Sequence, residues 1–294
     1  MKILIAVGSK EYSAPTLHVG IKVAKAFNAS TTIVDVGEKV SEFSTKVVGL
    51  TQERMESWDF ERPGIDVLEW AFSYLAEKQF IEPKLIEAGF PKNLLIQKDG
   101  RRAEVYLKGT VCDEVNLILR NGDIIAELRD EVYTENYDVM IIGGSGKRRM
   151  AHDLIQYVDS SIFVVKNFDP RQEYRILLAV DDSSGTKMAI KYGVRVAQAF
   201  GIGVDLLTIS KREHFGDGYK KAAMKAAKFM HRSGIEAKSV FKVGDPAKTI
   251  VQTAGKNHII IMGASTRSPL KKFFTGSKPL DAMEKCQCPI LIVK

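Results

Sequence analysis

The sequence has few cysteines and no long hydrophobic run. Three cysteines among 294 residues are too few for a disulfide framework, which fits a reducing compartment. No apolar stretch approaches the roughly 20 residues of a membrane-spanning helix. The apolar segment 3–7 is too short for a signal peptide. We therefore expect a cytoplasmic protein without a membrane partner.

Motifs of P-loop hydrolases and zinc enzymes are also missing. There is no Gly-x-x-x-x-Gly-Lys-Ser/Thr segment, and the five histidines show no i, i+4 pair enclosing a glutamate. Cys286 and Cys288 offer two thiols, whereas structural zinc needs four ligands, so we expect both thiols to be buried. His18 is expected to be exposed on its helix and His258 to lie at the edge of a strand. The sequence predicts no catalytic residue and no metal ligand.

Positive charge is concentrated in the C-terminal part of the chain. Residues 168–294 hold 22 lysines and arginines against 11 acidic residues, while residues 1–167 hold 21 against 25. A basic half could meet nucleic acid, an anionic metabolite or an acidic partner. The aromatic residues are not interleaved with the basic ones, as stacking platforms for single strands would be. Nucleic acid is therefore the less favoured partner.

The chain contains a duplicated unit. Segment 3–7 (ILIAV) recurs as 176–180 (ILLAV), and segment 20–27 recurs as 193–200. One offset of 173 residues relates both pairs, which indicates duplication rather than chance similarity. Two domains follow, 1–167 and 175–294, joined by the short polar linker 168–174.

Short apolar strands alternate with amphipathic helices in the second domain. Strands are predicted at 204–209, 237–243, 259–262 and 290–293, and a helix at 219–233. Nearly continuous apolar strands separated by helices favour an α/β fold, a doubly wound, Rossmann-like parallel sheet covered on both faces. Such sheets bind ligands beyond the carboxyl ends of their strands.

The first domain carries an additional α+β insertion of about 50 residues, at about 40–115. It is predicted to contain a helix that opens at Pro63 and buries Leu68 and Phe72. Segments 94–97 and 104–107 flank Asp99-Gly100, which favours a hairpin. Core packing is the simpler interpretation of its aromatic residues. A partner-binding face is the alternative.

Two segments of the second domain follow predicted strands with polar or glycine-rich sequence. Asp181 and Asp182 come directly after the first strand, and a loop from Gly263 to Gly276-Ser277 follows the fourth. Glycines let backbone approach a ligand closely, and a helix N-terminus after Ser277 would suit a phosphate group. A basic surface loop with a helix cap is the alternative.

With these motifs, residues 175–294 resemble the universal stress proteins, whose fold is like that of adenine nucleotide alpha hydrolases. The family signature is glycine, two residues, glycine, nine residues, then glycine and Ser/Thr. Here the matching positions are Gly263, Thr266, Gly276 and Ser277, so a threonine replaces the middle glycine. Segments 1–36 and 121–166 extend the resemblance to the tandem two-domain form.

The resemblance implies an adenine-nucleotide site in the C-terminal domain, for ATP or AMP, with Mg²⁺. Carried over by position, the nucleotide-binding residues are Ala179, Val180, Asp181, Ile209, Met262, Gly263, Thr266, Arg267, Gly276, Ser277 and Lys278. A β-branched Thr266 where the family glycine has positive φ would favour AMP, or no ligand. The first domain has Gly8 in place of Asp181, so no independent site is expected there.

These features predict a nucleotide-responsive signalling protein of the stress response rather than a turnover enzyme. The resemblance implies that the last strands of the two domains pair antiparallel within the chain, and that two chains form a homodimer. A slow ATP hydrolase or phosphotransferase, using Asp181 or Asp182 as base, is one alternative. The other is an interaction module with an empty loop.

Overall fold

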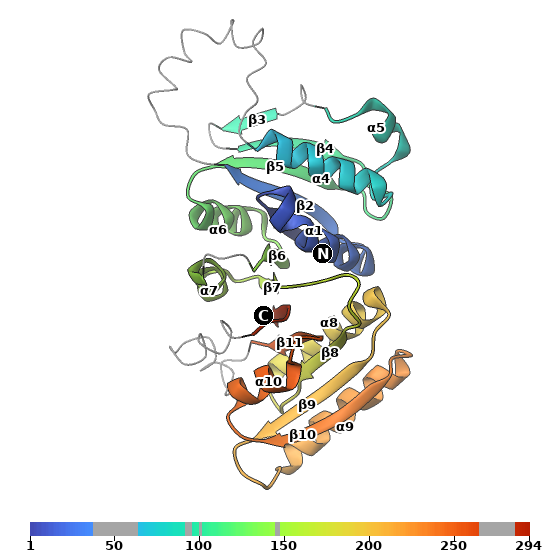
Figure 1. Cartoon of the computed structure of the whole chain (residues 1–294), viewed down its shortest axis with the longest axis vertical. Coiled ribbons are helices and arrows are strands. Elements are labelled where there is room, and N and C mark those ends of the chain that lie inside the picture. Colours follow the sequence, from blue (N-terminus) through green and yellow to red (C-terminus); the bar gives the residue numbers. More distant parts are fainter. Residues whose placement is uncertain (38–63, 92–95, 100–101, 145–147, 265–285) are drawn as a thin grey trace, which may run out of the picture.

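One continuous mixed sheet runs through the whole protein (Figure 1). The computed structural model describes residues 1–37, 64–91, 96–99, 102–144, 148–264 and 286–294. Its strands in chain order are β1 (Lys2–Val7), β2 (Ser30–Gly37), β3 (Ile96–Asp99), β4 (Arg102–Leu107), β5 (Val115–Asn121), β6 (Val139–Gly143), β7 (Ser161–Val165), β8 (Arg175–Ala179), β9 (Val204–Ser210), β10 (Ala237–Val243), β11 (His258–Gly263) and β12 (Ile290–Val293).

The order of the strands shows the duplication directly. Across the sheet it is β10-β9-β8-β11-β12-β7-β6-β1-β2-β5-β4-β3. The five strands β7-β6-β1-β2-β5 of the N-terminal half are parallel, and β12-β11-β8-β9-β10 repeat the same order. The halves meet where β12 pairs antiparallel with β7, with Leu291 opposite Phe163. The fold is therefore two Rossmann-like α/β units fused edge to edge.

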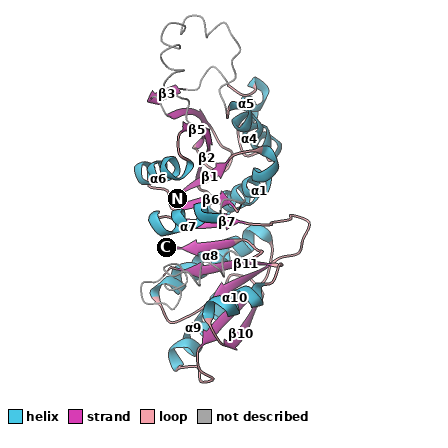
Figure 2. Cartoon of the chain, turned by 60° about the vertical axis from the view of Figure 1, so that its left-hand side comes forward, coloured by secondary structure: helices cyan, strands magenta, loops and turns pink. Residues whose placement is uncertain are grey.

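Helices cover both faces of this sheet (Figures 1 and 2). They are α1 (Lys10–Phe27), α4 (Ile65–Glu77), α5 (Pro83–Ala88), α6 (Ile124–Glu135), α7 (Arg148–Tyr157), α8 (Ser184–Phe200), α9 (Asp217–Arg232) and α10 (Pro246–Ala254). Helices α1, α4, α8 and α9 lie on one face, and α6, α7 and α10 on the other.

Alternating strand residues supply the two cores between these layers. In β1, Ile3 and Ile5 belong to the core under α1, whereas Leu4 belongs to the core under α6. Because both faces are covered, the central strands are apolar at nearly every position. Helix α1 approaches β1 so closely that a Cβ on Gly20 would lie 2.5 Å from Cδ1 of Ile5. Gly20 therefore has a packing reason, whereas a Cβ on its counterpart Gly193 would make only ordinary contacts, at 3.5 Å from Cε of Met230.

The inserted region differs in one respect from the sequence-based expectation. The predicted helix is α4, which begins at Ile65; Pro63 lies outside the described residues. It packs on β2 and β5 as α9 packs on β9 and β10, on the same face of the sheet. Helix α4 is thus the counterpart of α9. Within the inserted region, the described elements without a counterpart in the C-terminal half are α5 and the hairpin β3–β4, which extends the sheet beyond β5.

The connection between the two halves is less polar than its composition indicates. Phe168 and Tyr174, at its two ends, are buried and stack with ring centroids 4.9 Å apart. Phe168 also meets Phe200 at the end of α8, with ring centroids 5.9 Å apart. The hydroxyl of Tyr174 accepts a hydrogen bond from the backbone N–H of Asp169 at 3.0 Å. The linker is therefore anchored in the core.

Candidate functional site

The strand order reverses direction between β8 and β11. The chain passes from β8 to β9 on one side and later returns to β11 on the other. Such a switch point is where doubly wound sheets bind ligands, beyond the carboxyl ends of the strands. Three predicted residues, Ala179, Ile209 and Met262, lie at the ends of β8, β9 and β11 and contribute to the same core. The structure therefore brings them together on one face.

Asp181 lies two residues beyond the end of β8 at this point and is held in a defined position. Its Oδ1 accepts hydrogen bonds from the backbone N–H of Ser183 at 3.0 Å and from its hydroxyl at 2.5 Å. The Thr186 hydroxyl donates to the same oxygen at 2.5 Å, and its oxygen is 3.1 Å from the backbone nitrogen of Asp181. The carboxylate thus closes the first turn of α8 and stays at the switch point.

Gly263 ends β11 beside the same turn of α8. A Cβ added to Gly263 would lie 2.3 Å from the carbonyl carbon and oxygen of Gly185, so no other residue fits there. A Cβ on Gly185 would in turn lie 3.2 Å from the carbonyl oxygen of Ala264. Gly185 and Gly263 therefore allow the backbone of α8 and the backbone at the end of β11 to lie in direct contact at the rim of the site.

A second turn frames the site on the side of β10. Gly244 has φ +148°, and its N–H donates to the carbonyl of Ser210 at 2.9 Å. Asp245 then caps α10, its Oδ1 accepting from the backbone N–H of Lys248 at 3.1 Å. The ends of β9 and β10 are thereby tied to the start of α10.

The remaining predicted site residues divide into two groups. Val180 precedes Asp181 in the sequence, but its side chain is buried in the core under α8. Its backbone N–H donates to the carbonyl of Leu207 at 2.9 Å. It therefore offers no side chain to the site. The other five lie outside the described residues: Thr266, Arg267, Gly276, Ser277 and Lys278.

The equivalent place in the N-terminal half has the same frame without the carboxylate. Gly8 follows β1 where Asp181 follows β8, and its N–H donates to the Ser13 hydroxyl at 2.9 Å. At the end of β6 a Cβ on Gly143 would meet the Thr16 hydroxyl oxygen at 3.1 Å, a looser fit than at Gly263. This end of the first half carries no acidic side chain on β1 or directly after it.

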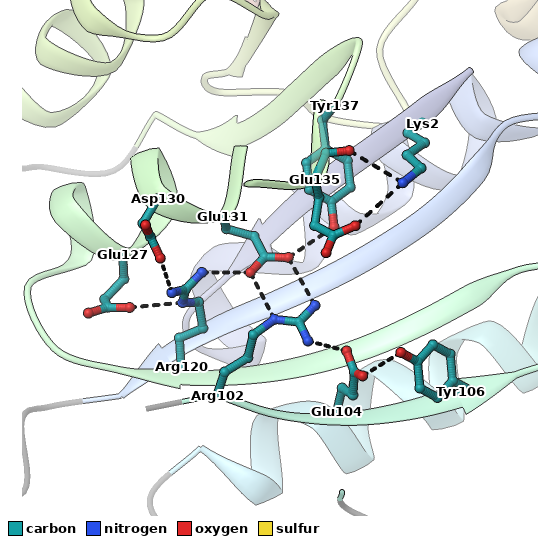
Figure 3. Close-up of polar contacts among 10 residues, drawn as sticks. All are labelled: Lys2, Arg102, Glu104, Tyr106, Arg120, Glu127, Asp130, Glu131, Glu135 and Tyr137. Carbon is teal, nitrogen blue, oxygen red and sulfur yellow. Dashed lines mark hydrogen bonds and ion pairs between the residues drawn. The ribbon is translucent and has the colours of Figure 1, made fainter. Parts of the chain in front are cut away.

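Carboxylates of the N-terminal half gather instead in a buried ionic network between α6 and the strands β4 and β5 (Figure 3). Glu131 is 1% exposed and accepts from Arg120 at 2.6 Å, from Arg102 at 3.1 and 3.2 Å, and from the Tyr137 hydroxyl at 3.1 Å. Glu127 binds Arg120 at 2.8 Å. Burial and Glu131 raise the pKa of the Tyr137 hydroxyl. These groups satisfy one another and leave a structural role as the direct interpretation.

One of the two histidines discussed above differs from expectation. His18 was expected to be exposed, but it is half-buried: its Nδ1 is 3.1 Å from the Tyr74 hydroxyl and its ring is 5.9 Å from Phe168. That prediction is wrong because α4 and the linker cover this part of α1. His258, the first residue of β11, is buried and lies 3.1 Å from Asp205, which also binds Arg175 at 2.9 Å.

The two C-terminal cysteines are buried free thiols, as predicted. Cys286 and Cys288 are 1% and 0% exposed, with their sulfur atoms 3.1 Å apart. In the described part of the chain, no three His, Cys, Asp or Glu side chains gather as a metal site would require. None of the described helices combines the length and apolar character needed to span a bilayer.

Comparison with known proteins gives consistent similarities. A family model described as the universal stress protein family matches residues 174–294. A universal stress protein from Archaeoglobus fulgidus DSM 4304 is 14% identical, with 100% of this chain and 96% of that chain covered and a TM-score of 0.59. A protein of unknown function from Pseudomonas aeruginosa PAO1 is 12% identical, with coverages of 100% and 92% and a TM-score of 0.56.

Shorter structures align with one half of the chain. The universal stress protein from Archaeoglobus fulgidus in complex with dAMP is 20% identical over 41% of this chain and 98% of that one, with a TM-score of 0.33. No curated protein has a significant match to the sequence.

Proposed function

Because residues 174–294 belong to the universal stress protein family, we propose that the C-terminal half binds an adenine nucleotide, ATP or AMP, at the carboxyl ends of β8, β9 and β11. The observation that carries this proposal is Asp181, a carboxylate fixed by Ser183 and Thr186 at the switch point of the sheet. In this role the protein is a binding and signalling protein, with nucleotide occupancy as its signal.

Each part of the site has a distinct recognition chemistry. The Asp181 carboxylate can accept hydrogen bonds from ribose hydroxyls or from the adenine amino group. Backbone at the end of β9, next to Ile209, can pair with the adenine edge. The loop from Gly263 to Ser277 would supply backbone N–H groups to the phosphates, with Arg267 and Lys278 adding positive charge.

Calorimetry on the full chain tests this proposal. We expect saturable binding of ATP or AMP, weakened at least tenfold by Asp181→Ala. Asp181→Asn keeps an oxygen that can accept the hydrogen bonds from Ser183 and Thr186, and so separates the role of the charge from that of these hydrogen bonds. Asp182→Asn is the matched control, because Asp182 is exposed and faces Gly218 of α9. Binding that is unchanged in Asp181→Ala would contradict the proposal.

The loop and the alternative functions need their own measurements. Gly276→Val is expected to weaken nucleotide binding without changing the far-UV dichroism. Phosphate release under excess ATP, abolished by Asp181→Ala, would favour the hydrolase. No heat with ATP, ADP or AMP would leave the interaction module as the remaining function.

A further inference from the structure

A cavity of about 510 Å³ lies where α1, α4 and α8 meet. Its walls include His18, Lys22 and Lys25 of α1, Tyr74 at the end of α4, Lys78 directly after it, and Gln198 of α8. Gln198 is 13 residues along α8 from Gly185, which at 1.5 Å per residue is about 20 Å from the switch point. The cavity is therefore separate from the proposed nucleotide site.

Three lysines line this cavity, and no carboxylate is among the described residues that line it. The Lys22 ammonium lies 4.9 Å from the centroid of the Phe200 ring, and the Lys25 ammonium donates to the carbonyl oxygen of Lys78 at 2.9 Å. In the described part of the chain neither Lys22 nor Lys25 forms an ion pair. Both ammonium groups therefore keep N–H donors for a ligand.

Among the described residues, Lys78 alone of the three lysines forms an ion pair. Its ammonium lies 2.6 Å from the Glu77 carboxylate, which is 66% exposed and does not line the cavity, and 5.3 Å from the Tyr74 ring centroid. Helices α1, α4 and α8 all end near the cavity, and their carbonyl ends carry partial negative charge. Three full positive charges exceed what these helix ends and Glu77 offset. The cavity keeps an excess of positive charge.

His18 adds a titratable group to the wall. Its Nδ1 meets the Tyr74 hydroxyl, and its Nε2 is buried and has no hydrogen-bond partner in the described chain. Burial, with Lys22 and Lys78 nearby, lowers the pKa of His18. A negative charge in the cavity would act in the opposite direction and raise that pKa.

The duplicated half shows that two of these lysines, Lys25 and Lys78, are not required by the fold, whereas Lys22 corresponds to Arg195 and so keeps its positive charge there. At the equivalent position, Gln198 replaces Lys25 and donates to the carbonyl of Ser233 at 3.4 Å, just as Lys25 donates to Lys78. Ser233 in turn replaces Lys78. The same contact between helix ends is thus made once with neutral side chains and once with two lysines.

We propose that this cavity is a second anion site, which binds a small phosphomonoester independently of the C-terminal nucleotide site. Its volume falls in the range of small-molecule sites, and its concave shape favours a compact ligand over an extended polymer. Tyr74 and the stems of the lysines can contact the organic part of the ligand, while the ammonium groups bind the phosphate.

The test follows the imidazole of His18 by NMR in the full-length protein. Sodium sulfate, which does not titrate near neutrality, is compared with sodium chloride at equal ionic strength. We expect sulfate to raise the pKa of His18 by about one unit and to leave the imidazole resonances of the exposed His231 where they are in chloride. At pH 7.5, glycerol 3-phosphate should give a saturable shift of the same resonance, and glycerol should give none.

Variants decide whether the cavity is responsible. The double variant Lys22→Gln/Lys25→Gln should abolish both responses, whereas Lys191→Gln, which removes an exposed charge of α8 outside the cavity, should keep them. An unchanged melting temperature of the double variant shows that it is folded. An equal pKa in sulfate and chloride, or a response retained by the double variant, would overturn the proposal. A response to sulfate without one to glycerol 3-phosphate would overturn the assignment to a phosphomonoester, leaving an adventitious ion only.

Discussion

The two halves of the sheet use the same frame with different groups in it. After β1 the N–H of Gly8 donates to Ser13 at 2.9 Å, and after β8 the N–H of Asp181 donates to Thr186 at 3.1 Å. The hydroxyl that braces the turn is present in both halves. The carboxylate is present only in the second. The turn is therefore common to both halves of the fold, whereas the acidic group at this position comes from the single side chain of Asp181.

The outer edges of the halves differ more strongly. In the first half, β5 is covered by the hairpin β3–β4 and is largely buried. Its counterpart β10 is an edge strand, with Phe241 and Val243 44% and 49% exposed. Lys238 and Lys242 lie on this edge, and such charges discourage pairing with another chain.

The position of buried charge follows from this difference. Arg120 of β5 is 6% exposed and is bound by carboxylates of α6, whereas Lys242 occupies the same position on the open edge and is exposed. Covering an edge turns a solvated cation into a buried one, which then needs partners. The network in Figure 3 is thus the consequence of the added hairpin.

Removing the carboxylate at the centre of this network should give the largest loss of stability. Glu131→Ala would leave Arg102 and Arg120 without their shared partner, and we expect the free energy of unfolding to fall by about 3–5 kcal/mol. Urea unfolding of the full chain measures this loss. Asp130→Ala is the control: Asp130 also binds Arg120, but its side chain is 61% exposed, so about 1 kcal/mol or less is expected. Equal losses would contradict a network that depends on burial.

A pair of glycine substitutions compares the two switch points. Gly263→Ala places a Cβ 2.3 Å from the backbone of Gly185, and we expect a loss of about 2–3 kcal/mol together with weaker nucleotide binding. Gly143→Ala meets only the Thr16 hydroxyl, at 3.1 Å, and should cost about 1 kcal/mol or less. Thermal unfolding of both variants checks the difference. Similar losses would mean that the close approach at Gly263 is not specific to the C-terminal half.

Most of the fold could be predicted from the repeated sequence. The predicted strands 237–243 and 290–293 coincide with β10 and β12. The uninterrupted apolar run of β12 marks a buried parallel strand, whereas β10 is an exposed edge strand whose apolar residues are separated by lysines and a serine. The hairpin around Asp99 was also correct within the described residues. The pattern of apolar residues predicts these elements because each of them packs in a sheet that is covered by helices.

What the sequence could not supply is long-range contact. Nothing in the sequence around His18 indicates that this residue contacts Tyr74, 56 residues away. Likewise, nothing in the sequence of α4 indicates that this helix takes the place of α9 in the first half. The ionic network was also missed, although Glu127 and Glu131 stand four apart on one helix, which was a usable signal. The homodimer and the role of Thr266 stay predictions.

Position 35 and its counterpart 208 place a polar group on the same side of the sheet in both halves. Burial, opposed by the N–H of Val36 and reinforced by Asp66, raises the pKa of Asp35 to about 7. The folded state therefore binds more protons than the unfolded state between about pH 4 and 7, so stability falls as pH rises through that window. We expect Asp35→Asn to raise the unfolding free energy by about 2 kcal/mol at pH 8 and by little at pH 4. The same gain at both values would show that charge is not the cause.

The counterpart of Asp35 in the second half, Thr208, allows a similar substitution with a smaller expected effect on stability. Thr208 is 0% exposed, and its hydroxyl has no hydrogen-bond partner within the described chain. Valine has nearly the same shape and no polar atom to desolvate, so Thr208→Val should raise the free energy of unfolding by about 1 kcal/mol. Unlike the effect at Asp35, this gain should be the same at pH 4 and pH 8, because a hydroxyl does not titrate there. Urea unfolding at both values checks it, and a loss of stability would mean that the hydroxyl has a bound water as its partner.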